Sequence, residues 1–169
     1  KDYGPASIET ARALTSLAVT LTELGLHSEA LPLKQRSLDI RDAISGRGDP
    51  LTAEAMNNLA VTYVHLAEYE KALPLQLESL RIRESTLGPA HTDVGQSLNN
   101  LATTYGYLGN YQQAFTYRQR AIQNIEAALG PEHPTVGLLL TAMASTLYDL
   151  ERYDESIATE NRALRIVRE

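Results

Sequence analysis

Four histidines are the side chains of this 169-residue sequence best suited to acid–base or metal chemistry. His91 and His133 occupy equivalent places 42 residues apart, and helix packing would separate two such places by roughly 10 Å. A metal ion needs its ligands within about 2.3 Å, so a role in capping or loop packing is favoured for both. His27 stands where equivalent positions carry Tyr, which favours packing, and His65 is a candidate for contact with a ligand.

Other patterns that carry chemistry are missing from the sequence. There is no cysteine, so disulfides and thiolate zinc sites are ruled out. We find neither His-Glu-x-x-His nor a phosphate-binding loop, and the glycines do not follow a strand as such a loop requires. The sequence therefore predicts no catalytic residue, no metal and no cofactor, and we expect that the protein is not an enzyme.

The charge balance narrows the class of partner. Lys and Arg number 15 against 21 Asp and Glu, giving a net charge of −6. A nucleic-acid binder needs a net basic face to displace phosphate counterions, so no nucleic-acid partner is expected. No apolar run approaches the roughly 18 residues of a membrane span, and no signal peptide is visible. We expect a cytoplasmic protein with no membrane partner.

Two pairs of asparagines carry the sharpest local signal for binding. Asn57-Asn58 and Asn99-Asn100 lie within helical patterns, where Asn is a poor helix former. A side-chain amide offers both a donor and an acceptor, which suits the backbone of a bound peptide. The same amides could instead bond within or between helical hairpins, and the sequence leaves both interpretations open.

A repeat of 42 residues positions these side chains. It recurs four times without a gap, and four copies account for nearly the whole chain. The copies span residues 4–45, 46–87, 88–129 and 130–169. The residues that recur include Gly4, Gly46, Gly88 and Gly130; Leu17-Ala18, Leu59-Ala60, Leu101-Ala102 and Met143-Ala144; and Leu38, Leu80, Ile122 and Leu164.

Each copy predicts two helices, because apolar residues recur at helical spacing. First helices are expected at 7–24, 50–67, 92–108 and 134–150, and second helices at 28–44, 70–87, 112–129 and 154–168. Asp49-Pro50 and His133-Pro134 each look like an N-cap followed by proline at the first helical position. Gly88 and Gly130 follow the second helices, where a left-handed C-cap favours glycine. Small residues such as Ala60 and Ala72 should let the paired helices approach closely.

At these residues the sequence resembles the tetratricopeptide repeat, and specifically the 42-residue kind of kinesin light chains. The residues that carry the resemblance are Asn57-Asn58-Leu59-Ala60, Tyr63, Tyr69, Ala72-Leu73-Pro74-Leu75 and Leu87-Gly88-Pro89, with the corresponding residues of the other copies. The resemblance implies an all-α fold, a right-handed superhelical α-solenoid of four helical hairpins. It also implies a protein-interaction scaffold or adaptor that holds an extended peptide in a concave groove.

By resemblance, Asn58, Asn100, Arg83 and Arg41 belong to that groove, although a solvated charge at the helix end is an alternative for Arg83. The full set of predicted groove residues is Asn57, Asn58, Asn99, Asn100, Val61, His65, Thr103, Tyr107, Tyr148, Arg41 and Arg83. The light-chain groove carries Lys where this sequence has Glu54 and Gln96. We therefore expect a mixed groove and weak peptide binding with modest salt dependence.

Two other functions remain open at this point. The repeats could form a regulatory sensor segment of a larger nucleotide-binding signalling protein. They could also self-associate end to end, because Leu164, Ile166 and Val167 give the last helix an apolar face and terminal repeats normally need a polar one. The chain opens with Lys1 and ends inside a helical pattern, so we expect a longer parent protein.

Overall fold

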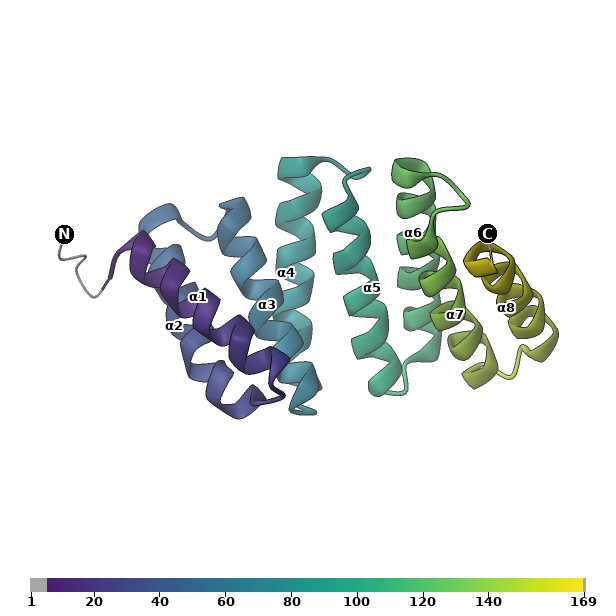
Figure 1. Ribbon diagram of the computed structural model, residues 1–169, viewed down its shortest axis with the longest axis horizontal. Coiled ribbons are helices and arrows are strands. Elements are labelled where there is room, and N and C mark those ends of the chain that lie inside the picture. The colour runs from purple at the N-terminus through teal and green to yellow at the C-terminus, as the bar shows by residue number, and fades with distance from the viewer. Residues whose placement is uncertain (1–5, 169) are drawn as a thin grey trace. The chain divides into compact units, whose positions relative to one another are not determined.

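A computed structural model describes residues 6–168, and these form eight α-helices and no strand (Figure 1). The helices are α1 (Ile8–Glu23), α2 (His27–Ser45), α3 (Pro50–His65), α4 (Tyr69–Leu87), α5 (Thr92–Tyr107), α6 (Tyr111–Leu129), α7 (Pro134–Asp149) and α8 (Tyr153–Arg168). Every predicted boundary lies within two residues of the observed one. The chain divides into two compact units, Lys1–Ile82 and Arg83–Glu169, whose boundary lies inside α4.

Polar side chains cap the first helix of each copy. Asp49 accepts hydrogen bonds from the backbone amides of Leu51 and Thr52, and proline follows it at the start of α3. His91 and His133 cap α5 and α7 in the same way, with Nδ1 accepting a backbone N–H at 3.2 Å in each case. The capping role predicted for these two histidines is confirmed. An acceptor at an N-cap satisfies one of the backbone donors that a helix start leaves without a partner.

Positive backbone φ angles mark the turns inside the hairpins. Gly25 and Gly109 have φ of 76° and 73°, which glycine adopts without a steric cost. The equivalent positions in the other two hairpins are Ala67 and Glu151, both with φ of 59°. A side chain in this region costs roughly 1–2 kcal/mol, so these two turns are the strained ones among the four.

The glycines after the second helices also have positive φ, but their conformation differs from the predicted left-handed cap. Gly46 and Gly130 have φ of 83° and 93° with ψ of 162° and 155°. Their backbone is therefore extended, in a region essentially restricted to glycine, and the chain leaves the helix directly. The left-handed helical conformation predicted for Gly130 is therefore wrong, although its φ is positive as such a cap requires.

Close contact within each hairpin depends on small residues. Ala18 and Ala30 of the first hairpin are both fully buried, and so are Ala60 and Ala72 of the second. In the last hairpin Ser156 takes the place of alanine and donates a hydrogen bond to the Ala144 carbonyl at 2.7 Å. The smallest side chains thus let the helices of a hairpin approach.

Packing of successive helices buries an apolar interior in the first unit. In the first unit, a core cluster joins α2, α3 and α4; its buried members are Leu38, Ala53, Met56, Leu59 and Ile82. In the second unit, ion pairs tie successive second helices together at the surface: Arg120 to Glu84 at 2.7 Å and Arg162 to Glu126 at 2.5 Å. Within the described residues, no helix is long and apolar enough to cross a membrane.

Candidate functional site

The second unit contains a cavity of about 430 Å³ beside the predicted groove residue Asn99. It lies between α5, the end of α6 and the start of α7, and its volume falls within the range of ligand pockets. The apolar part of its lining comes from Ile125, Leu129 and Leu139, whereas Gln96 and Asn99 contribute amides. Asp93 is the one charged residue that the lining contains.

Asn99 is oriented by its place on α5 and has an unused acceptor. Its backbone carbonyl accepts the Thr103 hydroxyl at 3.1 Å, one turn further along the helix. Its side-chain Oδ1 is buried, yet it accepts no hydrogen bond from the described part of the chain. A buried acceptor without a partner costs about 1–3 kcal/mol, so a donor supplied by a ligand would be favourable here.

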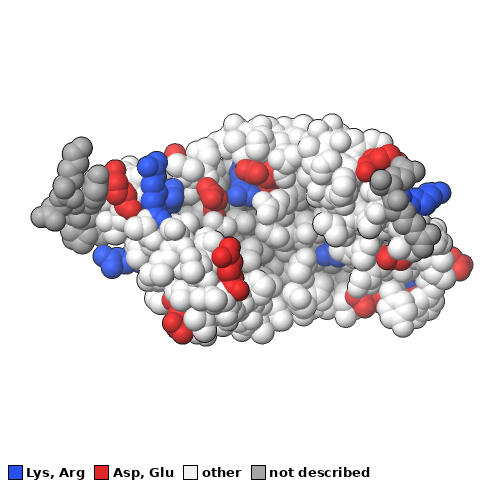
Figure 2. All heavy atoms as spheres, viewed as in Figure 1, with Lys and Arg blue, Asp and Glu red and all other residues white. Residues whose placement is uncertain are grey.

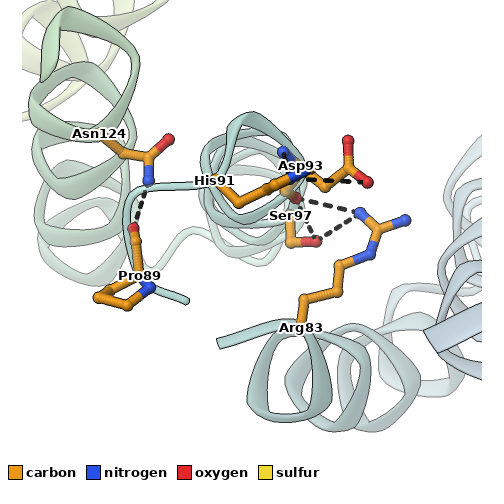
Figure 3. Close-up of polar contacts among 6 residues, drawn as sticks. All are labelled: Arg83, Pro89, His91, Asp93, Ser97 and Asn124. Atoms are coloured by element: carbon orange, nitrogen blue, oxygen red, sulfur yellow. Dashed lines mark hydrogen bonds and ion pairs between the residues drawn. The ribbon is translucent and has the colours of Figure 1, made fainter. Parts of the chain in front are cut away.

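The close approach of α6 to α5 shapes the back of this cavity. At Gly95 an added Cβ would overlap Oδ1 of Asn124 and lie 2.7 Å from Cδ1 of Ile125. Asn124 also donates a hydrogen bond of 2.5 Å to the Pro89 carbonyl, in the loop before α5 (Figure 3). Glycine at position 95 is therefore what allows α6 to sit this close.

In the first unit, Asn58 lines a much smaller cavity of about 10 Å³ between α1, α2 and α3, together with Thr15 and Val19. That volume is about enough for one water molecule. The cavity also meets Lys34, which is 8% exposed and donates to the Thr62 hydroxyl at 2.7 Å. Burial lowers the pKa of Lys34, and among the described residues no carboxylate pairs with it.

Arg118 takes the equivalent place in the second unit. It is 7% exposed, and its guanidinium donates to the Ala142 carbonyl at 2.5 Å and to the Thr103 hydroxyl at 3.2 Å. Burial lowers its pKa, and its Nε has no hydrogen-bond partner within the part of the chain that the structure describes. Lys34 and Arg118 thus bridge helices with cations that lack a carboxylate, and the sequence analysis missed both.

The two arginines of the predicted groove are interior residues. Arg83 is 5% exposed, and Figure 3 shows its guanidinium directed at the start of α5, where it donates to the Asp93 carbonyl at 3.1 Å and the Ser97 hydroxyl at 2.9 Å. The alternative of a solvated charge is therefore wrong for Arg83. Arg41 is also buried, at 8% exposure. A ligand could reach either guanidinium only after side chains rearrange.

His65 and His27 form a stacked pair at the hairpin ends of the first unit. Their ring centroids are 4.2 Å apart and their planes differ by 1°. Nitrogen lone pairs lie in the ring planes, so two parallel rings cannot converge on one ion at about 2.0–2.1 Å. Partial burial, followed by the charges of His27 and Lys34, lowers the pKa of His65. The lowered pKa favours the neutral form of His65.

The other predicted groove residues differ in how accessible they are. Tyr107 and Tyr148 are well exposed, at 60% and 64%, and Leu138, which belongs to the same helix as Tyr148, is 70% exposed. Val61, Thr103 and Asn100 are half-buried. Asn57 is 5% exposed, so its amide belongs to the interior. A ligand can therefore touch Asn58 in the first pair, and both Asn99 and Asn100 in the second, without a rearrangement of the surface.

The first unit also has a larger cleft that the sequence analysis did not anticipate. It measures about 540 Å³ and lies between α2 and α4. Leu38, Leu59 and Tyr63 form part of its lining, with Asp42 and Arg47 among the charged residues. No predicted groove residue lines it. Most predicted groove residues lie on first helices, whereas this cleft is lined largely by α2 and α4.

Charges of both signs are scattered over the face drawn in Figure 2, and most of that face is uncharged. No broad patch of one sign is visible there. Groups of three or more His, Asp or Glu that could hold a metal ion do not occur in the described region.

Comparison with known proteins identifies the repeat. A family model described as tetratricopeptide repeat matches residues 9–85, 51–117 and 93–169. No curated protein sequence matches significantly. The fold is similar to the crystal structure of BtubC (BKLC) from P. vanneervenii, with a TM-score of 0.86 and 20% identity, over 92% of this chain and 62% of that one.

Two further solved structures share the fold. A putative kinesin light chain of Podosopora anserina with nearly identical TPR-like repeats has a TM-score of 0.83 and 21% identity, covering 92% of this chain and 73% of that one. A Rap protein complexed with Competence and Sporulation Factor has a TM-score of 0.80 and 16% identity, covering 94% of this chain and 43% of that one. At these identities the likeness concerns the fold.

Proposed function

Because the chain belongs to the tetratricopeptide repeat family, we propose that it is a protein-interaction module and that an extended peptide segment binds along its first helices. Repeats of this kind, and a neighbour that was crystallised with a bound factor, support a role in protein interaction generally. The finer proposal concerns where and how the segment is held.

The observation that carries the proposal is the unsatisfied Oδ1 of Asn99 beside the cavity between α5 and α7. Oδ1 is buried in this conformation, so the Asn99 amide must first rotate toward the cavity, and a backbone N–H of an extended peptide can then donate to it. The neighbouring cavity of about 430 Å³ can take an apolar side chain against Leu129 and Leu139. A segment with an apolar anchor next to an extended backbone therefore fits both features.

The exposed side chains of the same unit extend this surface. Tyr148 and Leu138 on α7 and Tyr107 on α5 offer apolar contact. In the first unit the equivalent of Asn99 is Asn57, which is buried, and Asn58 beside it lines a cavity that holds only about one water. We therefore assign the anchor to Asn99 of the second unit.

The charges predict how binding should respond to salt. One carboxylate, that of Asp93, lines the main cavity, and the buried cations Lys34 and Arg118 have little contact with solvent. Screening by salt acts mainly on exposed charges. Binding in the micromolar class with a modest dependence on salt is expected.

A library of fluorescent peptides, titrated against the parent chain and two variants, tests the proposal. Asn99→Ala should weaken the selected peptides about 5–30-fold, which corresponds to the loss of one hydrogen bond worth about 1–2 kcal/mol. Asn110→Ala is the matched control, because Asn110 is exposed and its side chain makes no capping hydrogen bond. Equal affinities for both variants would contradict the assignment, as would the absence of binding from the whole library.

A further inference from the structure

The last helix presents a stripe of apolar side chains to solvent. Ile157, Leu164 and Val167 of α8 are 62%, 44% and 65% exposed, and Tyr153, one turn before Ile157, is 51% exposed. Ile166, predicted to belong to this face, is instead 5% exposed, and its side chain lies close to Gly137 of α7. The exposed stripe, here called the α8 face, consists of Tyr153, Ile157, Leu164 and Val167.

In the other second helices the position of Leu164 is buried and that of Ile157 is half-buried. Leu38, Leu80 and Ile122 are equivalent to Leu164, and they are 5–7% exposed. In the first unit, Leu38 of α2 lies in one core cluster with Leu59 of α3, and Leu31 and Tyr63 pack against that cluster. The α8 face therefore corresponds to the side of α2 that packs against α3.

The first helix presents the other side of such a contact. Leu17 of α1 and Leu24, the residue that ends this helix, are 52% and 68% exposed. Residues equivalent to Leu17 in the later copies are Leu59, Leu101 and Met143, and these are 0–6% exposed. We call Leu17, Leu21 and Leu24 the α1 face. In later repeats, the equivalent side of the first helix packs against the preceding second helix.

From this complementarity we propose that the α8 face of one copy of this chain docks on the α1 face of a second copy. The α2–α3 interface is the template. Shifted by whole repeats, Leu38 and Leu59, which share the core cluster, become Leu164 and Leu17, and Leu31 and Tyr63, which pack against that cluster, become Ile157 and Leu21. Every one of these positions is apolar in this sequence.

Such a contact joins two different surfaces, so it is heterologous and leaves one free face at each end of the assembly. A large exposed apolar patch on a soluble protein generally marks an interaction site. A second copy fits this one because it supplies the complementary register at the spacing that the repeat already uses. Association should therefore be concentration-dependent and should extend beyond a dimer.

Light scattering after gel filtration, over a concentration range from about 10 µM to about 1 mM, tests the proposal. The weight-average mass of the parent chain should rise above the 18.6 kDa of one copy. Leu17→Glu blocks the α1 face and Ile157→Glu blocks the α8 face, so each variant alone should remain at the mass of one copy. Leu51→Glu is the matched control, because Leu51 is 48% exposed, close to the 52% of Leu17, and belongs to neither face, and it should associate like the parent.

Mixing the two blocked variants distinguishes head-to-tail docking from a symmetric contact. Leu17→Glu keeps its α8 face and Ile157→Glu keeps its α1 face, so an equimolar mixture should form a dimer and nothing larger. A parent chain that stays at the mass of one copy throughout the range would overturn the proposal and leave the faces to another protein or a flanking segment. A single variant that still associates, or a mixture that does not, would also overturn it.

Circular dichroism shows whether the variants are folded. If either loses helix, Leu24→Glu and Val167→Glu replace them, since these residues belong to the same two faces and are still more exposed. The same outcomes then apply to the second pair.

Discussion

Replacing two glycines of α5 by alanine should change the stability of the protein in opposite directions. The difference in unfolding free energy measures how tightly α6 packs against α5. At Gly95 an added Cβ would overlap Asn124 and lie within 2.9 Å of two carbons of Ile125. At Gly106 the same atom would meet nothing within 4 Å. Both residues lie within the helix and neither has a positive φ, so the gain in helix propensity, about 1 kcal/mol, is similar at the two sites.

The expected magnitudes follow from these distances. Gly106→Ala should stabilise the protein by about 0.5–1 kcal/mol. Gly95→Ala gains the same amount but also overpacks the contact, which costs about 1–3 kcal/mol. The two variants should therefore differ by about 1–3 kcal/mol, or roughly 2–4 °C in melting temperature for each kcal/mol in a chain of this size.

Urea unfolding of the two variants and the parent, followed by circular dichroism, measures this difference. Adding Asn124→Ala to Gly95→Ala removes the nearest atom, so the penalty of the alanine should shrink in that background. If Gly95→Ala stabilises the protein as much as Gly106→Ala does, α6 does not approach α5 as closely as described and the reasoning fails.

Two further predictions concern Arg83 and His65. Arg83→Ala should cost about 1–3 kcal/mol, because it removes a buried donor to a carbonyl and a hydroxyl. Arg81→Ala removes only an exposed ion pair with Glu78 and should leave the urea midpoint almost unchanged, so midpoints that shift equally for both would show that Arg83 is not an interior residue. The folded-state pKa of His65 is lowered, so stability is fully present above the ordinary value of about 6.5 and should be lost as pH falls below it. Melting temperatures at pH 7.5 and 5.5 should thus differ less for His65→Tyr than for the parent, and an unchanged difference would rule out this titration.

The sequence predicted the helices well because the signals that set them are local and occur four times. The residues Asp49 and Pro50 define the start of α3 by themselves, and His133 and Pro134 do the same for α7. A period of 42 residues then confirms each boundary from the other copies. Hence the hairpins, their N-caps and their small contact residues could be deduced before the structure was known.

The accessibility of individual polar residues could not be deduced in this way. Asn57 and Asn58 are neighbours in the sequence, yet one is buried and the other lines a cavity. Whether Arg83 reaches solvent depends on Ser97 and the carbonyl of Asp93, which α5 brings to it. Resemblance to a family identifies equivalent positions in the repeat, but it does not say which of these side chains a neighbouring helix covers.

Some of this missing information lies in the differences between the four copies. The position of Gly95 is glycine in two copies and alanine in two, and the residue thirty positions later changes with it. The pairs are Gly95 with Ile125, Gly137 with Val167, Ala11 with Arg41, and Ala53 with Arg83. A β-branched side chain has its bulk next to the backbone and needs the space that glycine leaves, which the short distance from Gly95 to Ile125 illustrates. An arginine carries its bulk further out, as Arg83 does in reaching Ser97, and leaves room for a methyl group. The joint change at these two positions thus indicates the close contact of Gly95 with Ile125, even when no other sequence is compared.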